Sequence, residues 1–253
     1  MIPKTIHYCW FGRGKKNELA LKCIESWHKV LPDYKIKEWN EDNFDVTLYP
    51  YAKEALESRK YAFVTDVVRL YALYTEGGVY LDTDVEVLKT FDPFLHHHMF
   101  SGFENNGFVP TGMMAAEKGS KWAKDLLDEY TDRHFVLENG NFDLTTNTKT
   151  ITDYMIKQGL RLDNTFQDFP GLCTMYPFEF FCPKDHGTGE ISCTANTVCI
   201  HHFAGSWIKQ NWLGRQLSNL KKKLTPILGG KTVAFLSDVA TGRFLKGKHS
   251  YRN

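Results

Sequence analysis

Apolar residues recur along the chain with two spacings, one typical of helices and one typical of strands. Residues 17–31 and 61–76 carry apolar side chains at helical spacing. Residues 2–12 contain an apolar run and residues 34–39 alternate, as buried and half-buried strands do. Because a strand, a helix and another strand follow one another at the start, the pattern predicts an α/β fold with a parallel sheet.

Weaker patterns complete this expectation. Further helices are predicted at residues 50–60, 120–138 and 150–158. Short strands are predicted at residues 79–81, 85–88 and 197–200, and a pair of strands around a turn within residues 99–116. Residues 160–190 contain several aromatics and prolines without regular spacing, and we expect irregular structure there.

The most specific chemistry follows the apolar run 79–81, where Asp82 and Asp84 stand one residue apart. In an extended chain, residues i and i+2 point to the same side, so both carboxylates can face one point. Two such oxygen ligands at the end of a buried strand suit a divalent cation such as Mg²⁺ or Mn²⁺. A polar turn, in which aspartate is common, is the alternative for this pair taken alone.

The preceding helix carries a second polar pair, Asp66 and Arg69, three residues apart on one helix face. An exposed ion pair of this kind contributes little to stability. The same face also carries apolar residues, however, and the helix leads directly into the acidic strand end. We therefore expect both side chains near Asp82 and Asp84.

The run from Asp66 to Asp84 reads D-x-x-R-x-x-x-L-x-x-x-G-G-x-Y-x-D-x-D. It resembles the sugar-binding region with a DxD motif found in glycosyltransferases, and is similar to family 32, which includes capsular-polysaccharide enzymes and yeast-type mannosyltransferases. Glucosylating bacterial toxins share this core. The resemblance extends over residues 2–207 and implies the GT-A fold, a Rossmann-like, mainly parallel central sheet with helices on both faces.

The resemblance also implies roles for these four side chains. Asp84 would bind the metal, and Asp82 would contact both the metal and the ribose of a nucleotide-sugar donor. Asp66 and Arg69 would contact the donor, and Arg69 would help to stabilise the departing diphosphate, since an arginine can hold several oxygens in one plane.

Trp10 lies near the end of the predicted strand 2–12, in the segment I-H-x-x-W-x-G. The resemblance implies that its ring is the platform for the nucleotide base, where stacking contributes roughly 1–3 kcal/mol. A core position is the alternative for Trp10. His7, inside the same apolar run, is expected to be a structural histidine.

A third metal ligand is expected from His201 and His202, which end the predicted strand 197–200. Alternation allows only one of them to face the metal. The following segment resembles the H-F-x-G turn of glycogenin-like retaining transferases, in which the histidine binds manganese. The resemblance implies a ligand set of Asp82, Asp84 and His202, with His201 as the alternative, and imidazole favours Mn²⁺.

Two more residues enter through the same resemblance. Ser206 and Trp207 would approach the β-phosphate and close over the donor, although a buried cluster of aromatic and histidine side chains is the alternative. Asn147 stands where related enzymes have a polar loop near the sugar, but the residues differ here. A helix N-cap is the other account of this segment.

Length and charge set the domain expectation. The 253 residues suit one catalytic domain, residues 1–207, with a tail at 208–253. The net charge of +1 argues against a nucleic-acid partner. The tail, however, has ten lysines and arginines against one acid and is amphipathic, which suits an anionic membrane surface. A solvated charge run is the alternative.

Targeting signals and cysteines add little. The chain shows neither a secretory leader nor an apolar run long enough to span a bilayer. None of its six cysteines forms a C-x-x-C pair. Related Golgi enzymes carry an N-terminal membrane anchor, and this sequence shows none. We therefore expect a bacterial, cytoplasmic enzyme that is peripheral on the inner face of the cell membrane.

The resulting hypothesis is a metal-dependent, retaining hexosyltransferase that uses a nucleotide-diphosphate sugar, with uridine donors favoured. Its acceptor would be a glycan or a lipid-linked glycan of a surface polysaccharide. Two other classes stay open. A haloacid-dehalogenase-like phosphohydrolase has a similar D-x-D strand, although Glu86 does not fit that motif. A non-catalytic carbohydrate-binding protein could retain the same fold.

Overall fold

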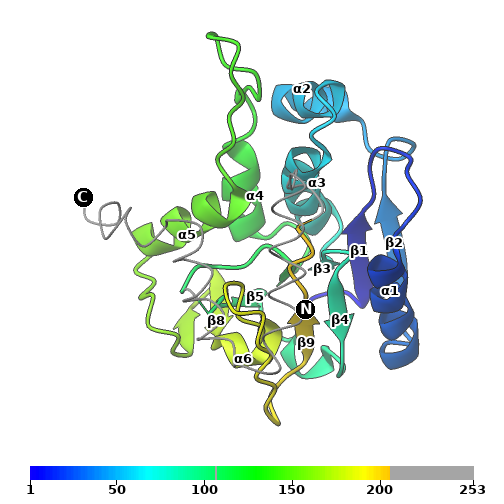
Figure 1. Ribbon diagram of the computed structural model, residues 1–253. Helices are drawn as coiled ribbons and strands as arrows, with labels where there is room; N and C mark the ends of the chain where they lie inside the picture. The colour runs from blue at the N-terminus through cyan, green and yellow to red at the C-terminus, as the bar shows by residue number, and fades with distance from the viewer. Residues whose placement is uncertain (106, 206–253) are drawn as a thin grey trace, which may run out of the picture. The chain divides into compact units, whose positions relative to one another are not determined.

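The computed structural model describes residues 1–105 and 107–205 (Figure 1). Residues 1–183 and 193–205 belong to one compact unit, to which the following description refers. Residues 184–192 belong to a second unit, whose other residues lie outside the described part. The expected domain boundary at residue 207 and the basic tail also lie outside it, so both stay predictions.

A seven-stranded sheet forms the centre of the first unit, in the order β2-β1-β3-β6-β5-β8-β7. Five of the strands run in one direction, whereas β6 and β7 are reversed. The expected α/β fold with a mostly parallel sheet is therefore confirmed. The strands are β1 Thr5–Cys9, β2 Lys35–Trp39, β3 Gly78–Leu81, β5 Met99–Gly102, β6 Met113–Ala116, β7 Gln167–Phe169 and β8 Cys173–Tyr176.

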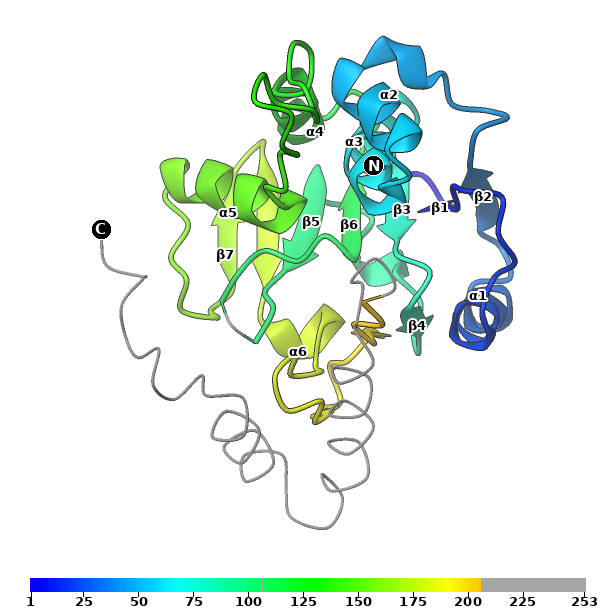
Figure 2. The ribbon, with the colours of Figure 1, turned by 45° about the horizontal axis from the view of Figure 1, so that its top comes forward.

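Helices cover both faces of this sheet, because strand residues alternate between two apolar clusters (Figure 2). Tyr80 belongs to one cluster, and its neighbours Val79 and Leu81 belong to the other. The first face is covered by α2 Pro50–Glu57, α3 Tyr61–Thr75, α4 Lys121–Asp128 and α5 Asn147–Lys157. The second is covered by α1 Glu18–Val30, α6 Phe178–Phe181 and the 3₁₀ helix η2 Asp92–Phe94. Another 3₁₀ helix, η1 Val46–Leu48, precedes α2.

Two expectations from the sequence were wrong. The predicted helix 120–138 ends at Asp128, and the chain continues as a loop in which Val136 and Phe142 form an isolated bridge. The segment 160–190 is not wholly irregular, because it supplies β7, β8 and α6. These elements have only three or four residues each, too few for a period to be visible. Within the described residues, no helix combines the length and apolar character needed to cross a bilayer.

The paired glycines of the motif let β3 lie directly beside β1. Gly78 has a φ of +121°, and a Cβ there would lie 2.5 Å from the carbonyl oxygen of Thr5. Parallel pairing sets Ile6 beside Val79, so the carboxyl ends of β1 and β3 meet at one edge of the sheet. Ligands bind at this edge in open α/β sheets.

A second, two-stranded sheet brings distant parts of the chain to the same place. β4 Val85–Val87 pairs antiparallel with β9 Cys199–His201, with Val85 opposite His201. The backbone N–H of His202 also donates to the carbonyl of Asp84 at 2.9 Å. The histidine pair therefore lies beside the acidic motif although more than 100 residues separate them in sequence.

Candidate active site

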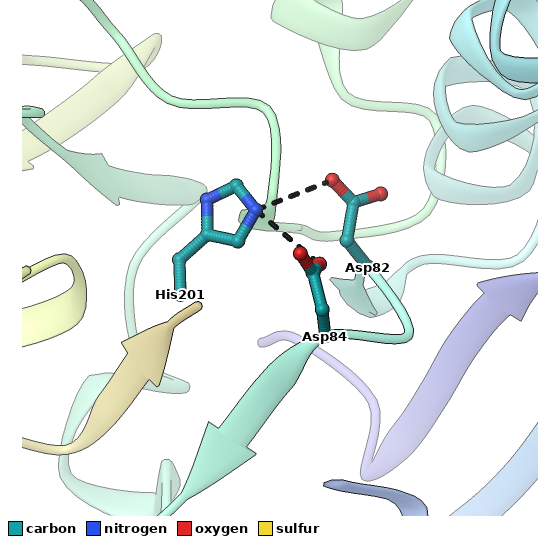
Figure 3. A group of neighbouring side chains, drawn as sticks. All are labelled: Asp82, Asp84 and His201. Atoms are coloured by element: carbon teal, nitrogen blue, oxygen red, sulfur yellow. Dashed lines mark ion pairs between the residues drawn. The ribbon is translucent and has the colours of Figure 1, made fainter. Parts of the chain in front are cut away.

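Asp82, Asp84 and His201 form a group that could hold a metal ion (Figure 3). The His201 Nε2 atom lies 3.3 Å from Asp84 Oδ1 and 3.9 Å from Asp82 Oδ2. One ligand atom from each residue lies within 4.8 Å of the other two. Ligands at right angles around an ion with bonds of about 2.1 Å lie about 3 Å apart. The three side chains therefore fit a small divalent cation after minor adjustment.

The histidine of this group is His201, so the choice of His202 from the sequence was wrong. The His202 side chain lies elsewhere, with Nε2 2.9 Å from Glu86 Oε2. Glu86 in turn pairs with Lys22 at 3.3 Å. His201 is the last residue of β9, and successive side chains along an extended chain point to opposite sides. Once His201 faces the carboxylates, His202 must face away.

The two carboxylates do converge, although not in the way the sequence suggested. Residues 82–84 form a turn and do not continue the strand, because the Val85 N–H donates to the carbonyl of Asp82 at 2.9 Å. The N–H of Asp82 donates to the carbonyl of Gly112 at 2.8 Å. The turn and this bond together direct both carboxylates toward His201.

The surroundings of Asp84 favour its charged form. Its Oδ2 accepts the backbone N–H of Ala204 at 2.7 Å. Burial alone would raise the pKa of Asp84, but His201 and the Ala204 N–H outweigh it and lower the pKa to about 2. Burial would likewise lower the pKa of His201, yet the Asp84 carboxylate raises it well above the ordinary value. A cation bound here would replace the imidazole proton.

The guanidinium of Arg69 contacts the carboxylates of both Asp66 and Asp82. Its Nη2 lies 3.3 Å from Asp66 Oδ1 and 3.5 Å from Asp82 Oδ1. Nε donates to the carbonyl of Thr65, and Nη1 donates to the carbonyl of Thr111 at 2.8 Å. The side chain is only 5% exposed, so the guanidinium binds protein groups in this structure and fixes the position of Asp82.

Comparison with known families agrees with the position of this group. Residues 17–101 match the family model described as "Glycosyltransferase sugar-binding region containing DXD motif". These residues are therefore similar to a glycosyltransferase sugar-binding region. The matched stretch contains helix α1, the Asp66–Arg69 pair and both Asp82 and Asp84. Trp10 and His201 lie outside it.

Two fungal relatives share part of the chain. Inositol phosphoceramide mannosyltransferase 3 of Schizosaccharomyces pombe is 36% identical over 118 residues, covering 42% of this chain and 32% of the relative. A mannosyl phosphorylinositol ceramide synthase of Saccharomyces cerevisiae is 31% identical over 102 residues, covering 38% and 26%. The chain thus spans about a third or less of the length of these relatives.

Among solved structures, the PaToxG glycosyltransferase is similar with a TM-score of 0.45 and 17% identity. The similarity covers 62% of this chain and 69% of that one.

Within the matched stretch, Tyr80 makes contacts that could not be assigned from the family resemblance. Its hydroxyl donates to Asp82 Oδ1 at 2.9 Å, and the Arg69 guanidinium lies 4.8 Å from its ring centre. Tyr80 lies in β3 and Asp82 follows directly after the strand, two residues further on, so the spacing alone could have indicated this bond. The apolar run 79–81 by itself predicts only that Tyr80 lies in a buried strand.

Asn147 contacts the backbone of Asp66. The side-chain amide of Asn147 donates to the backbone carbonyl of Asp66 at 3.0 Å. Burial raises the pKa of Asp66 to about 6, although Arg69 opposes this shift. The N-cap of α5 is Thr146, whose side chain accepts from the N–H of Lys149. Asn147 is therefore not the cap but a buried residue beside Asp66.

Trp10 is half-buried just beyond β1, at the edge of the sheet from which Asp82 also projects. Its indole N–H donates to the carbonyl of Gly14 at 2.6 Å, which fixes the ring. Lys16 lies 5.4 Å from the ring centre and pairs with Glu38 at 2.6 Å. Of the remaining predicted donor residues, Ser206 and Trp207 lie outside the described residues.

Proposed function

We propose that this chain is a metal-dependent glycosyltransferase that moves a hexose from a nucleoside-diphosphate sugar to a hydroxyl acceptor. The observation that carries the proposal is the convergence of Asp82, Asp84 and His201 at the end of β3, within and beside a sugar-binding region. A divalent cation bound by these residues would neutralise the charge that develops on the departing diphosphate. Mn²⁺ is the preferred ion, because the set contains an imidazole.

The residues of the chain have separate tasks in this proposal. Arg69 and Tyr80 hold Asp82 in position through their contacts with its Oδ1 atom. Asp66, buried beside Arg69, offers a carboxylate for the hydroxyl groups of the donor sugar. Trp10 offers an aromatic face to the nucleotide base. Transfer with retention of configuration is part of the proposal and is tested by the anomeric form of the product.

The donor and acceptor are proposed by chemical class. A uridine-linked hexose follows from the tryptophan platform, and mannose is added because both fungal relatives are named for mannosyl transfer. The same names favour a lipid carrying hydroxyl groups, or a lipid-linked glycan, as acceptor. The basic tail 208–253 would hold the protein on an anionic membrane that presents such an acceptor.

The experiment is a donor hydrolysis and transfer assay with Mn²⁺ and a panel of UDP-hexoses and GDP-mannose. Asp84→Asn should abolish turnover, whereas Asp128→Asn, at an exposed carboxylate paired with Lys124, should leave it unchanged. Sugar binding without turnover would favour the carbohydrate-binding alternative. Phosphate release from phosphomonoesters would favour the phosphohydrolase.

The membrane part is tested separately by flotation with vesicles containing anionic lipid. The full chain should float with these vesicles and not with neutral ones. Replacing Lys221, Lys222 and Lys223 by glutamate should reduce flotation. Equal flotation of both proteins would contradict the membrane proposal and leave the transferase proposal intact.

A further inference from the structure

Gly112 lies directly against the imidazole of His201. A Cβ at this position would lie 2.7 Å from Nδ1, 2.8 Å from Cε1 and 3.1 Å from Cγ of that ring. Gly112 is not among the residues with positive φ, so its backbone conformation is open to any residue type. Space beside the imidazole, and not backbone geometry, therefore requires glycine here.

The imidazole also packs against the ring of Phe203. The two ring centres are 4.2 Å apart and the ring planes are inclined by 35°. Phe203 has a φ of +52°, which is rare for a bulky residue and marks a constrained segment. The same turn brings the Ala204 N–H onto Asp84. His201 thus packs against both Gly112 and Phe203, and we call these two residues the slot.

This slot replaces the usual way of orienting a metal-binding histidine. Such a histidine ordinarily donates its second ring N–H to a carboxylate, a carbonyl or water. Here Nδ1 is buried and has no hydrogen-bond partner among the described residues. The Cys182 thiol lies near the ring, but a thiol is a weak hydrogen-bonding group. Packing by the slot therefore helps to set the direction of Nε2, together with its contact to Asp84.

The segment that contains Gly112 also holds the rest of the site. The carbonyl of Gly112 accepts the N–H of Asp82, and the carbonyl of Thr111 accepts Nη1 of Arg69. Residues 111–112 therefore contact Arg69, Asp82 and His201, which come from three segments of the chain: helix α3, the turn after β3 and strand β9. A displacement here changes the spacing of the metal-binding groups directly.

We propose that Gly112 is a positioning residue for the cation site, because its missing side chain sets where His201 meets Asp84. The inference rests on the proposed metal-dependent function. A methyl group at residue 112 would push the imidazole by several tenths of an ångström, since contacts below 3.0 Å require a shift. Changes in the groups that orient a metal ligand cost roughly 10- to 100-fold in affinity.

The test is titration of the full chain with Mn²⁺, with free ion measured by electron paramagnetic resonance. Gly112→Ala should weaken Mn²⁺ binding at least about tenfold, with thermal unfolding close to that of the wild type. Gly14→Ala is the matched control, because a Cβ there has no atom within 4 Å and its Mn²⁺ affinity should not change. Phe203→Leu, which removes the aromatic ring packed against His201, should weaken binding too and serves if Gly112→Ala does not fold.

A double-mutant cycle separates positioning from general damage. In a His201→Ala background the imidazole is gone, so Gly112→Ala should cause no further loss of Mn²⁺ affinity. An equal loss in both backgrounds, or wild-type affinity in Gly112→Ala, would overturn the inference while the proposed function stands. Failure of the wild-type protein to bind Mn²⁺ would instead overturn the proposed function and the inference with it.

Discussion

The guanidinium of Arg69 lies 3.5 Å from Asp82 Oδ1 while it also donates to the carbonyl of Thr111. These two partners come from the end of β3 and from the segment before β6. The buried Arg69 side chain therefore fixes the Asp82 carboxylate relative to the segment that leads into β6. The relationship explains why the arginine belongs to the same motif as the two aspartates.

Arg69→Lys should not preserve the site. Lysine keeps the charge but cannot bind Asp66, Asp82 and Thr111 together, because only arginine has a planar array of donors. Each lost hydrogen bond to a charged group costs about 1.5–3 kcal/mol, so we expect a lower free energy of unfolding in urea and a loss of turnover.

Arg161→Lys is the control for this substitution. Its guanidinium is 66% exposed and pairs with Asp163, so unfolding and turnover should match the wild type. An Arg69→Lys protein with wild-type stability and turnover would contradict the assigned role.

Substitutions of the two adjacent histidines should differ in their effect on Mn²⁺ affinity. His201→Ala removes an imidazole from the Asp82–Asp84 group, so Mn²⁺ affinity should fall at least about tenfold. His202→Ala removes the contact with Glu86 instead and should retain Mn²⁺ binding. Calorimetric titration with Mn²⁺ measures both. The reverse result would restore the assignment made from the sequence.

The sequence predicted those parts of the fold in which the pattern is long and local. Helices α1 and α3 begin and end within one residue of the expected bounds, because their apolar faces repeat over several turns. The acidic end of β3 could also be located, since Gly78, Asp82 and Asp84 lie in one short run. Local sequence was sufficient for these features.

Features that depend on pairing between distant segments could not be predicted. The selection of His201 depends on which residue ends β9 opposite Val85, and neighbouring histidines look alike in the sequence. The turn at residues 82–84 depends in part on the carbonyl of Gly112, which lies on another segment. β7 and β8 become strands through pairing in the sheet, and their own patterns are too short to show it.

Trp10 should contribute to nucleotide binding through its ring face. We expect Trp10→Ala to raise the Kd for UDP, measured with Mn²⁺ present, roughly 5- to 150-fold. Trp10→Phe retains an aromatic face and should lose much less. Unchanged UDP affinity in Trp10→Ala would show that the ring is only part of the core.

His7 should make stability depend on pH. It is fully buried, with Nε2 2.7 Å from the carbonyl of Gly77 and Nδ1 accepting from the indole of Trp39 at 3.1 Å. Burial lowers the pKa of His7 below 6.5, so below that pH the unfolded chain takes up a proton that the folded one does not. The free energy of unfolding should therefore fall as pH drops below 6.5, by up to about 1.4 kcal/mol per unit.

The measurement compares urea unfolding of the wild type and His7→Gln between pH 5 and pH 8. The advantage of the wild type should be largest above pH 6.5 and shrink toward acid pH. A difference between the two proteins that does not vary with pH would contradict this interpretation of His7.

The pairing of β4 with β9 has a consequence for protein synthesis. As the ribosome makes the chain, Asp82 and Asp84 emerge long before His201, which must wait for β9. Until β9 has been made, the proposed cation site lacks its imidazole. A translation product that stops before residue 199 would carry the acidic motif in full and yet lack the imidazole, so the proposed cation site could be completed only after β9 has been made.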